Sequence, residues 1–149
     1  MPAELKGFLN RRVARRHNQI LIGDLEATID NSVFRAGIED SLTTVSESMN
    51  EYSVRGWAYD PSTRTPPLAV LLADANRVIA SAAFNEVRDH LARKDLVSCM
   101  AGFSLSAANV ELAGDPFLII LSHDLRARLV PLAVGRYEVE NDWSDELLS

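Results

Sequence analysis

Short apolar runs separated by turn signals are the feature that most restricts how this chain of 149 residues can fold. From about residue 37 they follow one another closely, with no long helical stretch between them. Regularly spaced short strands are typical of an antiparallel β-sandwich. We therefore predict a mainly β domain over residues 37–135, an Ig-like or jelly-roll-like sandwich of about seven strands at 38–45, 52–59, 68–73, 77–84, 102–105, 117–121 and 125–132.

The first 36 residues show a different pattern. Leu5, Phe8, Leu9 and Val13 recur at steps of three or four, which places them on one stripe of a helix. Arginines occupy the remaining faces of that helix. We predict an α-helical, basic extension over residues 1–36. For residues 24–34, a second short helix and a loose connection both remain open.

Charge is divided unevenly along the chain. The formal net charge is −6, from 15 Lys and Arg against 21 Asp and Glu. The first 17 residues are nevertheless basic, whereas residues 136–149 are acidic and are predicted to form a flexible tail. A pI near 5.0 argues against binding nucleic acid over the whole surface, so we do not expect a nucleic-acid partner.

Several classes of protein are excluded by composition. The single Cys99 rules out an intramolecular disulfide framework and a cysteine-rich zinc module. No apolar run approaches the roughly 18–20 residues of a transmembrane helix, and no apolar core follows the basic N-terminus as in a secretory signal. We expect a cytoplasmic protein, and leave peripheral contact with a membrane open.

The most specific motif is Val54-Arg55-Gly56-Trp57-Ala58-Tyr59-Asp60-Pro61. It resembles the Gly-Trp-Ala-x-Asp-Pro signature of a small bacterial β-sandwich module. The elements that follow this signature in the family have counterparts here in the same order: a hydrophobic strand, a hairpin, an Ala-rich strand, an Arg-Asp loop and the Gly102-Phe103 strand. The resemblance covers roughly residues 37–132. It departs at Arg88-Asp89, which lacks an intervening residue, and at the hairpin, which has Ala75-Asn76 where glycine is usual.

The resemblance implies a non-catalytic accessory domain, found with glycosyltransferases and other proteins of surface-polysaccharide synthesis. It implies no specific ligand residue. Physical chemistry gives the signature a role in the fold: Trp57 can fill the space between two sheets, Gly56 permits close approach of a neighbouring chain, and Asp60 can accept backbone N–H bonds in a turn stiffened by Pro61. The residues expected to specify the fold are Gly56, Trp57, Asp60, Gly102 and Phe103.

The sequence holds no catalytic, metal or cofactor constellation. The three histidines, His17, His90 and His123, are far apart and lack a second ligand at metal spacing. The adjacent pairs Asp89-His90 and His123-Asp124 do not make catalytic dyads, because neighbours on a strand point to opposite faces. The glycines are scattered singly, so no phosphate-binding loop is present. We expect neither enzymatic activity nor a cofactor.

Three functions follow as hypotheses. The first is assembly through the N-terminal helix, either by self-association or on a protein partner such as a glycosyltransferase, with contacts from Leu5, Phe8, Leu9, Arg12, Val13 and Arg16. The second is polysaccharide binding, in which Trp57 and Trp143 supply further aromatic surface to contacts from Tyr52, Tyr59, Arg88 and Asp89. The third is regulation by a cyclic dinucleotide, because the Arg-x-x-x-Arg pairs and Asp30-Asn31-Ser32 resemble the PilZ pattern, with its glycine displaced to Gly37.

Overall fold

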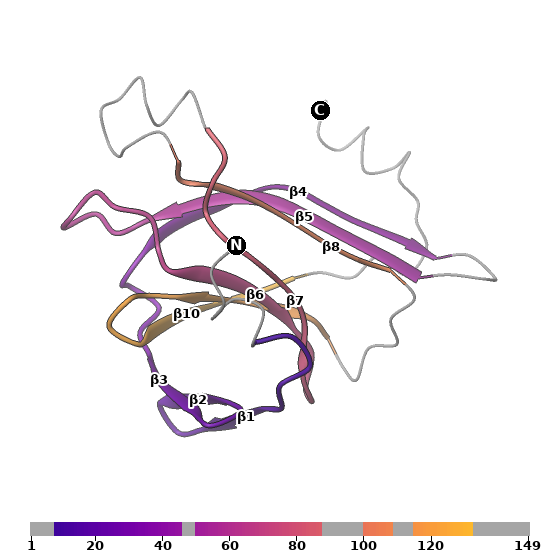
Figure 1. The fold of residues 1–149 in the computed structure, drawn as a ribbon, viewed down its shortest axis with the longest axis horizontal. Helices are drawn as coiled ribbons and strands as arrows, with labels where there is room; N and C mark the ends of the chain where they lie inside the picture. Colours follow the sequence, from indigo (N-terminus) through magenta and orange to yellow (C-terminus); the bar gives the residue numbers. More distant parts are fainter. Residues whose placement is uncertain (1–7, 46–49, 88–99, 109–114, 133–149) are drawn as a thin grey trace.

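The structure, a computed structural model, describes residues 8–45, 50–87, 100–108 and 115–132, and these residues form ten β-strands (Figure 1). The strands are β1 (Val13–Arg16), β2 (Gln19–Ile22), β3 (Leu25–Ile29), β4 (Arg35–Val45), β5 (Asn50–Tyr59), β6 (Ala69–Ala73), β7 (Val78–Ala82), β8 (Gly102–Ala108), β9 (Phe117–Leu121) and β10 (Arg126–Pro131). The predicted mainly β fold is confirmed, and the seven predicted strands correspond to β4 to β10. In the described part, no helix is long and apolar enough to cross a membrane.

The strands form two sheets. The larger has the order β1-β2-β3-β10-β9-β6-β7, and the smaller has the order β4-β5-β8. Every neighbouring pair is antiparallel except β3 and β10, which run parallel. The wholly antiparallel sandwich expected from the sequence is therefore present only in part, since the larger sheet is mixed.

The larger sheet closes on itself. Arg12, just before β1, pairs with Arg77, just before β7, in an isolated antiparallel bridge. Backbone hydrogen bonds continue this pairing, from Val13 N to Asn76 O (2.8 Å) and from Val78 N to Arg11 O (2.9 Å). The first and last strands of the sheet are thereby joined, and the sheet forms a small barrel below the three-stranded sheet in Figure 1.

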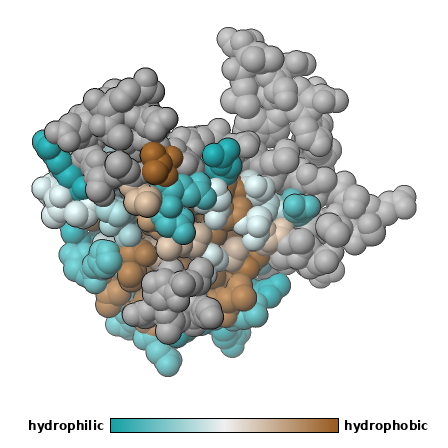
Figure 2. Space-filling view, turned by 45° about the horizontal axis from the view of Figure 1, so that its top comes forward, coloured by the Kyte–Doolittle hydropathy of each residue, from teal (hydrophilic) through white to brown (hydrophobic). Residues whose placement is uncertain are grey.

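Two hydrophobic cores lie on opposite faces of the barrel wall. The barrel interior contains Phe8, Val13, Ile20, Ile22, Ala27, Ala69, Leu71, Ala73, Val78, Ile119, Leu121 and Ala127. The second core lies between the barrel and the smaller sheet, and includes Tyr52, Val54, Val70, Leu72, Phe103, Leu105, Leu118 and Ile120. Strands β6 and β9 supply alternate residues to both cores, which explains why their sequences are almost continuously apolar. In Figure 2 hydrophilic residues line the lower edge of the view, and most of the visible hydrophobic surface lies above them, toward the middle.

The helix predicted for residues 1–36 is wrong over the described part of that segment. Residues 13–29 form β1, β2 and β3, joined by the two-residue turns 17–18 and 23–24. His17 has φ 32° and Gly23 has φ 63°, the left-handed values that tight hairpins require. Of the predicted helical stripe, Phe8 and Val13 point into the barrel together with Ile20 and Ile22, whereas Leu9 is exposed. Residues 1–7 lie outside the described residues.

The Gly-Trp signature joins the strands of the smaller sheet. A Cβ on Gly56 would lie 2.4 Å from Gly37 O and 3.0 Å from the Phe103 ring, so the predicted close approach at Gly56 is confirmed. Trp57, by contrast, does not fill the space between the sheets. Its indole lies over Gly37 on the outer face of the smaller sheet, because residues 52, 54 and 58 take the inward positions of β5.

Candidate functional site: a polar pocket at the strand ends

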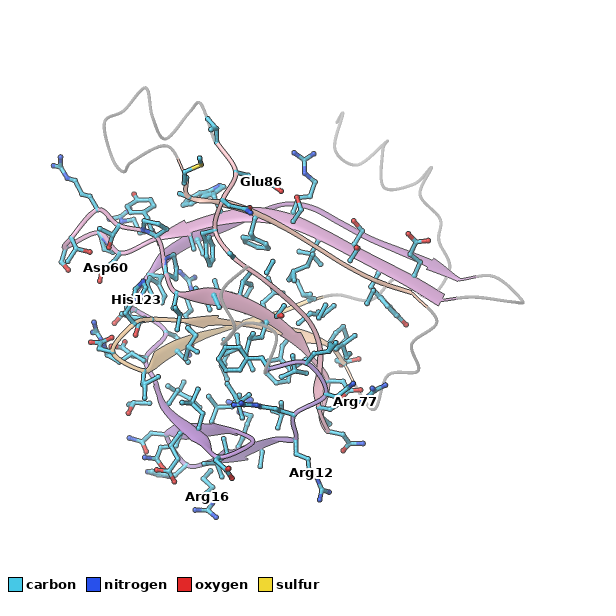
Figure 3. The ribbon with its side chains drawn as sticks, in the orientation of Figure 1. Arg12, Arg16, Asp60, Arg77, Glu86 and His123 are labelled. Atoms are coloured by element: carbon cyan, nitrogen blue, oxygen red, sulfur yellow. The ribbon has the colours of Figure 1, made fainter. Side chains whose placement is uncertain are left out.

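Three loops meet at one end of the molecule and line an open pocket of about 270 Å³. The loops connect β3 to β4, β5 to β6 and β9 to β10, and the last of these continues into the start of β10. Leu68 N donates to Leu121 O (2.9 Å), which brings the end of the β5–β6 loop beside the β9–β10 loop. In Figure 3, Asp60 and His123 lie together at this end. The pocket is lined by Phe34, Asp60, Ser62, Thr63, Thr65, Pro66, Pro67, Ser122, His123, Asp124 and Arg126.

Asp60 organises the β5–β6 loop. Its Oδ1 accepts hydrogen bonds from Ser62 N (2.8 Å) and Ser62 Oγ (2.7 Å), so the predicted turn role of Asp60 is confirmed. Its backbone also pairs with Thr65 through Asp60 N and Thr65 O (2.8 Å). Hydrogen bonds from Ser62 lower the pKa of the Asp60 carboxyl, although desolvation acts in the opposite direction.

The β9–β10 loop is held by a network around Ser122, which is buried. Ser122 Oγ donates to Asp124 Oδ1 and accepts from Arg126 N (2.8 Å). Arg126 Nε in turn donates to Asp124 Oδ2 (3.0 Å). The bonds from Ser122 and Arg126 lower the pKa of the Asp124 carboxyl. Asp124 is thus bonded to Ser122 and Arg126, and these bonds fix the turn that carries His123.

Arg126 links this network to the β3–β4 connection. Its Nη1 lies 3.8 Å from Asp30 Oδ2, and Asp30 Oδ1 accepts from Ser32 N (3.1 Å) and Ser32 Oγ (2.7 Å). The Ser32 hydrogen bonds lower the pKa of the Asp30 carboxyl. All three aspartates therefore favour the ionised form. Among the residues that line the pocket, Asp60 and Asp124 outnumber the one guanidinium, that of Arg126, so the lining is anionic.

The pocket offers hydrogen-bonding groups on internally hydrogen-bonded loops between apolar walls. Pro66, Pro67 and the buried Phe34 supply the walls, whereas Ser62, Thr63 and Thr65 supply hydroxyl groups. Its volume is close to the lower end of the about 300–1,000 Å³ found for small-molecule pockets, which suits a ligand of about one ring. Among the residues that the structure describes, no group of three or more His, Cys, Asp or Glu side chains is placed to hold a metal ion.

The predicted glycan contacts are not brought together at the pocket. Tyr52 is 8% exposed and faces the core between the sheets, where burial raises the pKa of its hydroxyl. Tyr59 is also buried and stacks on Trp57, with ring centroids 5.9 Å apart and an interplanar angle of 22°. Arg88 and Asp89 lie outside the described residues. Neither tyrosine can serve as an exposed sugar platform in this arrangement.

The predicted partner-binding stripe is divided between the interior and the surface. Phe8 is 4% exposed and Val13 is 7% exposed, and both pack inside the barrel, which corrects their assignment as contacts for another protein. Leu9, Arg12 and Arg16 are exposed. Leu5 lies outside the described residues. Strand pairing, rather than a helix, decides which side of this segment faces solvent.

The two halves of the PilZ-like pattern do not form one site in the described contacts. Asp30 and Ser32 bond to each other, and Asp30 pairs with Arg126 from β10. Arg12 and Arg16 lie on the barrel side shown at the bottom of Figure 3, away from Asp60 and His123.

The sequence contains a local signal for the turns at this end of the molecule. An aspartate and a serine two residues apart follow three strands: Asp30 and Ser32 after β3, Asp60 and Ser62 after β5, and Ser122 and Asp124 after β9. Each pair forms a local side-chain hydrogen bond. Such pairs predict tight turns, but only the strand order brings the three turns to one end.

No protein-family model matches the chain, and neither the curated proteins nor the solved structures compared with it gave a match.

Proposed function

We propose that the chain is a non-catalytic recognition module that binds a neutral or basic sugar residue of a glycan in the pocket at the strand ends. The observation that carries this proposal is the convergence of two hydrogen-bonded turns, each with an ionised aspartate and a serine hydroxyl, around a cavity of about one ring. Phe34, from the loop that follows the Asp30–Ser32 turn, completes the lining. Loops held by internal hydrogen bonds suit recognition because less conformational entropy is lost when the ligand binds.

A polyhydroxyl ligand matches the chemistry of the lining. Ionised carboxylates accept short, charge-assisted hydrogen bonds from hydroxyl groups, and each carboxylate has about four lone-pair positions. The two bonds that Asp60 accepts from Ser62 therefore leave acceptor capacity for a ligand. His123, which is exposed at the rim, adds a polar ring. The anionic character of the pocket disfavours uronic acids and other negatively charged sugars.

The proposed role is non-catalytic because the polar side chains of the β9–β10 loop are bonded to one another. Ser122 Oγ and Asp124 are engaged in the turn, and Arg126 completes it, so these side chains support the loop. The setting that accompanies the proposal, surface-polysaccharide synthesis, comes from the resemblance of the Gly-Trp-Ala-Tyr-Asp-Pro motif. Assembly through an N-terminal helix is not part of it, because residues 13–29 belong to the barrel.

The proposal is tested by titrating the protein with neutral hexoses, a hexosamine and a hexuronic acid, using ligand-observed NMR and calorimetry. His123→Ala and Asp60→Asn are the informative variants. Asparagine keeps an oxygen that can accept the Ser62 bonds, so the loop is retained while the charge is lost. Loss of one good polar contact weakens binding by about tenfold. Asp24→Asn, an exposed aspartate in the β2–β3 turn, is the matched control.

We expect the neutral or basic sugars to bind and the two pocket variants to bind them more weakly, with Asp24→Asn unchanged. Tighter binding of the hexuronic acid would contradict the assignment. So would failure of every sugar to bind at millimolar concentration, or equal weakening by the control.

A further inference from the structure

A second surface, on a different side of the barrel, carries unpaired positive charge. Arg12 and Arg16 stand four residues apart on and just before β1, so their side chains project to the same side of the strand. Arg77 is the cross-strand partner of Arg12. Figure 3 shows Arg12 and Arg16 extending away from the body of the molecule, with Arg77 near Arg12. We call Arg12, Arg16 and Arg77 the arginine face.

These charges form no close ion pair with a described residue, and the carboxylate that the strand register places on the same outer face is that of Glu26, two strands away on β3. Neither Arg12 nor Arg16 forms an ion pair with a described residue, and Arg77 Nη1 donates only to the neutral Asn10 Oδ1 (2.8 Å) among the described contacts. Like charges directly opposite each other on paired strands are destabilising, which applies to Arg12 and Arg77. The arginine face therefore costs stability in the isolated chain, and an anionic partner would relieve that cost.

We propose that the arginine face docks the protein on an anionic membrane surface. Arg12 and Arg16 are separated by about 13 Å along an extended strand, a spacing that suits several lipid headgroups in a plane. Leu9, beside this strand, is 50% exposed and supplies an apolar side chain for the headgroup boundary. The arginine face contains no aromatic side chain, so it lacks the stacking surface with which proteins hold single-stranded nucleic acid.

Docking of this kind is driven by electrostatic attraction between arginine and lipid headgroups, which acts only over a short distance. Each arginine near an anionic leaflet strengthens binding by about fivefold, and the effect decays within a Debye length of about 8–10 Å. The anionic pocket at the strand ends lies away from Arg12 and Arg16 in Figure 3, so docking leaves it accessible. The membrane proposal does not depend on the sugar proposal, since it uses other residues.

The experiment is sedimentation of the full chain with phosphatidylcholine vesicles, with and without about 30 mol% phosphatidylglycerol as the anionic lipid. Arg12→Glu/Arg16→Glu is the test variant. Arg55→Glu is the control, because Arg55 is an exposed arginine on β5 of the other sheet. Thermal melting establishes that both variants remain folded.

We expect binding only to the anionic vesicles, at least about tenfold weaker binding by Arg12→Glu/Arg16→Glu, and unchanged binding by Arg55→Glu. Raising NaCl from about 50 mM to about 500 mM should release the protein. Equal binding to neutral vesicles, or equal loss in both variants, would overturn the proposal. Arginine-dependent binding to a single-stranded oligonucleotide that is tighter than binding to the vesicles would also overturn it, in favour of nucleic acid.

Discussion

At the scale of single residues, two glycines leave space in which an added Cβ would meet a neighbouring strand. Gly56 on β5 and Gly37 on β4 leave room for each other's strand, and Gly37 also accepts the Trp57 indole above it. A Cβ at Gly37 would lie 2.7 Å from the indole ring. Gly56 and Trp57 of the signature therefore serve packing within the smaller sheet. The Trp57 indole covers the backbone of β4 at Gly37 on the outer face of that sheet.

We predict that Gly56→Ala destabilises the protein by about 2 kcal/mol or more. The added methyl group would lie 2.4 Å from Gly37 O, a backbone atom that can move only if β4 moves. Urea denaturation followed by fluorescence measures the change. Ser106→Ala, at an exposed position of β8, should stay within about 0.5 kcal/mol of the parent protein. A stability of Gly56→Ala equal to that of Ser106→Ala would show that the strands can separate without cost.

At the scale of elements, the loops of the pocket owe their shape to local aspartate–serine hydrogen bonds. The same device recurs after β3, β5 and β9, and Arg126 connects the first and third of these turns. Because these bonds favour ionised carboxylates, the pKa values of Asp30, Asp60 and Asp124 all lie below the ordinary value of 3.8. Loop stability is thereby linked to pH.

We predict that the melting temperature falls as the pH decreases below about 4. A carboxyl whose pKa is lower in the folded than in the unfolded state stabilises the fold fully above the unfolded value. That contribution disappears as the pH falls through the folded value. In Asp124→Asn one such group no longer titrates, so the melting temperature should depend less steeply on pH between about 4 and 2, as thermal scans at a series of pH values would measure. Parallel profiles for the two proteins would contradict this linkage.

At the scale of the whole molecule, the N-terminal segment is a structural part of the barrel. Residues 10–13 bond to residues 76–78, and Phe8 and Val13 enter the interior beside Ile20 and Ile22. Removing residues 1–36 would take away three of the seven strands of the larger sheet. The segment is therefore needed for the fold, whichever partners the protein has.

Phe8 and Leu9 give a matched test of this arrangement. We predict that Phe8→Ala costs about 3–5 kcal/mol of unfolding free energy, because Phe8 is 4% exposed and its removal leaves a cavity. Leu9→Ala should cost no more than about 0.5 kcal/mol, since Leu9 is 50% exposed. Chemical denaturation of both variants distinguishes them. Similar losses would mean that this segment is packed differently.

The sequence predicted some parts of this structure well because their signals are local. The alternation in β5, the apolar runs of β6 and β9, and the Asp60-Pro61 turn each depend on neighbouring residues. The N-terminal segment has a helical pattern because Phe8, Leu9 and Val13 recur at steps that a helix would place on one face. In the structure, strand pairing buries Phe8 and Val13 and leaves Leu9 exposed. Trp57 was assigned to the wrong face because one strand by itself does not reveal which of its faces is covered.

The sequence by itself determined a β-rich chain, the positions of seven strands and the turns that end them, since these depend on side-chain alternation and short-range hydrogen bonds. Only the tertiary structure decided that the basic segment closes a barrel, that three separated aspartate–serine turns meet at one end where two of them line a pocket, and that Arg12 stands opposite Arg77 on an exposed face. Strand order and register bring together residues far apart along the chain, and no local pattern encodes those pairings.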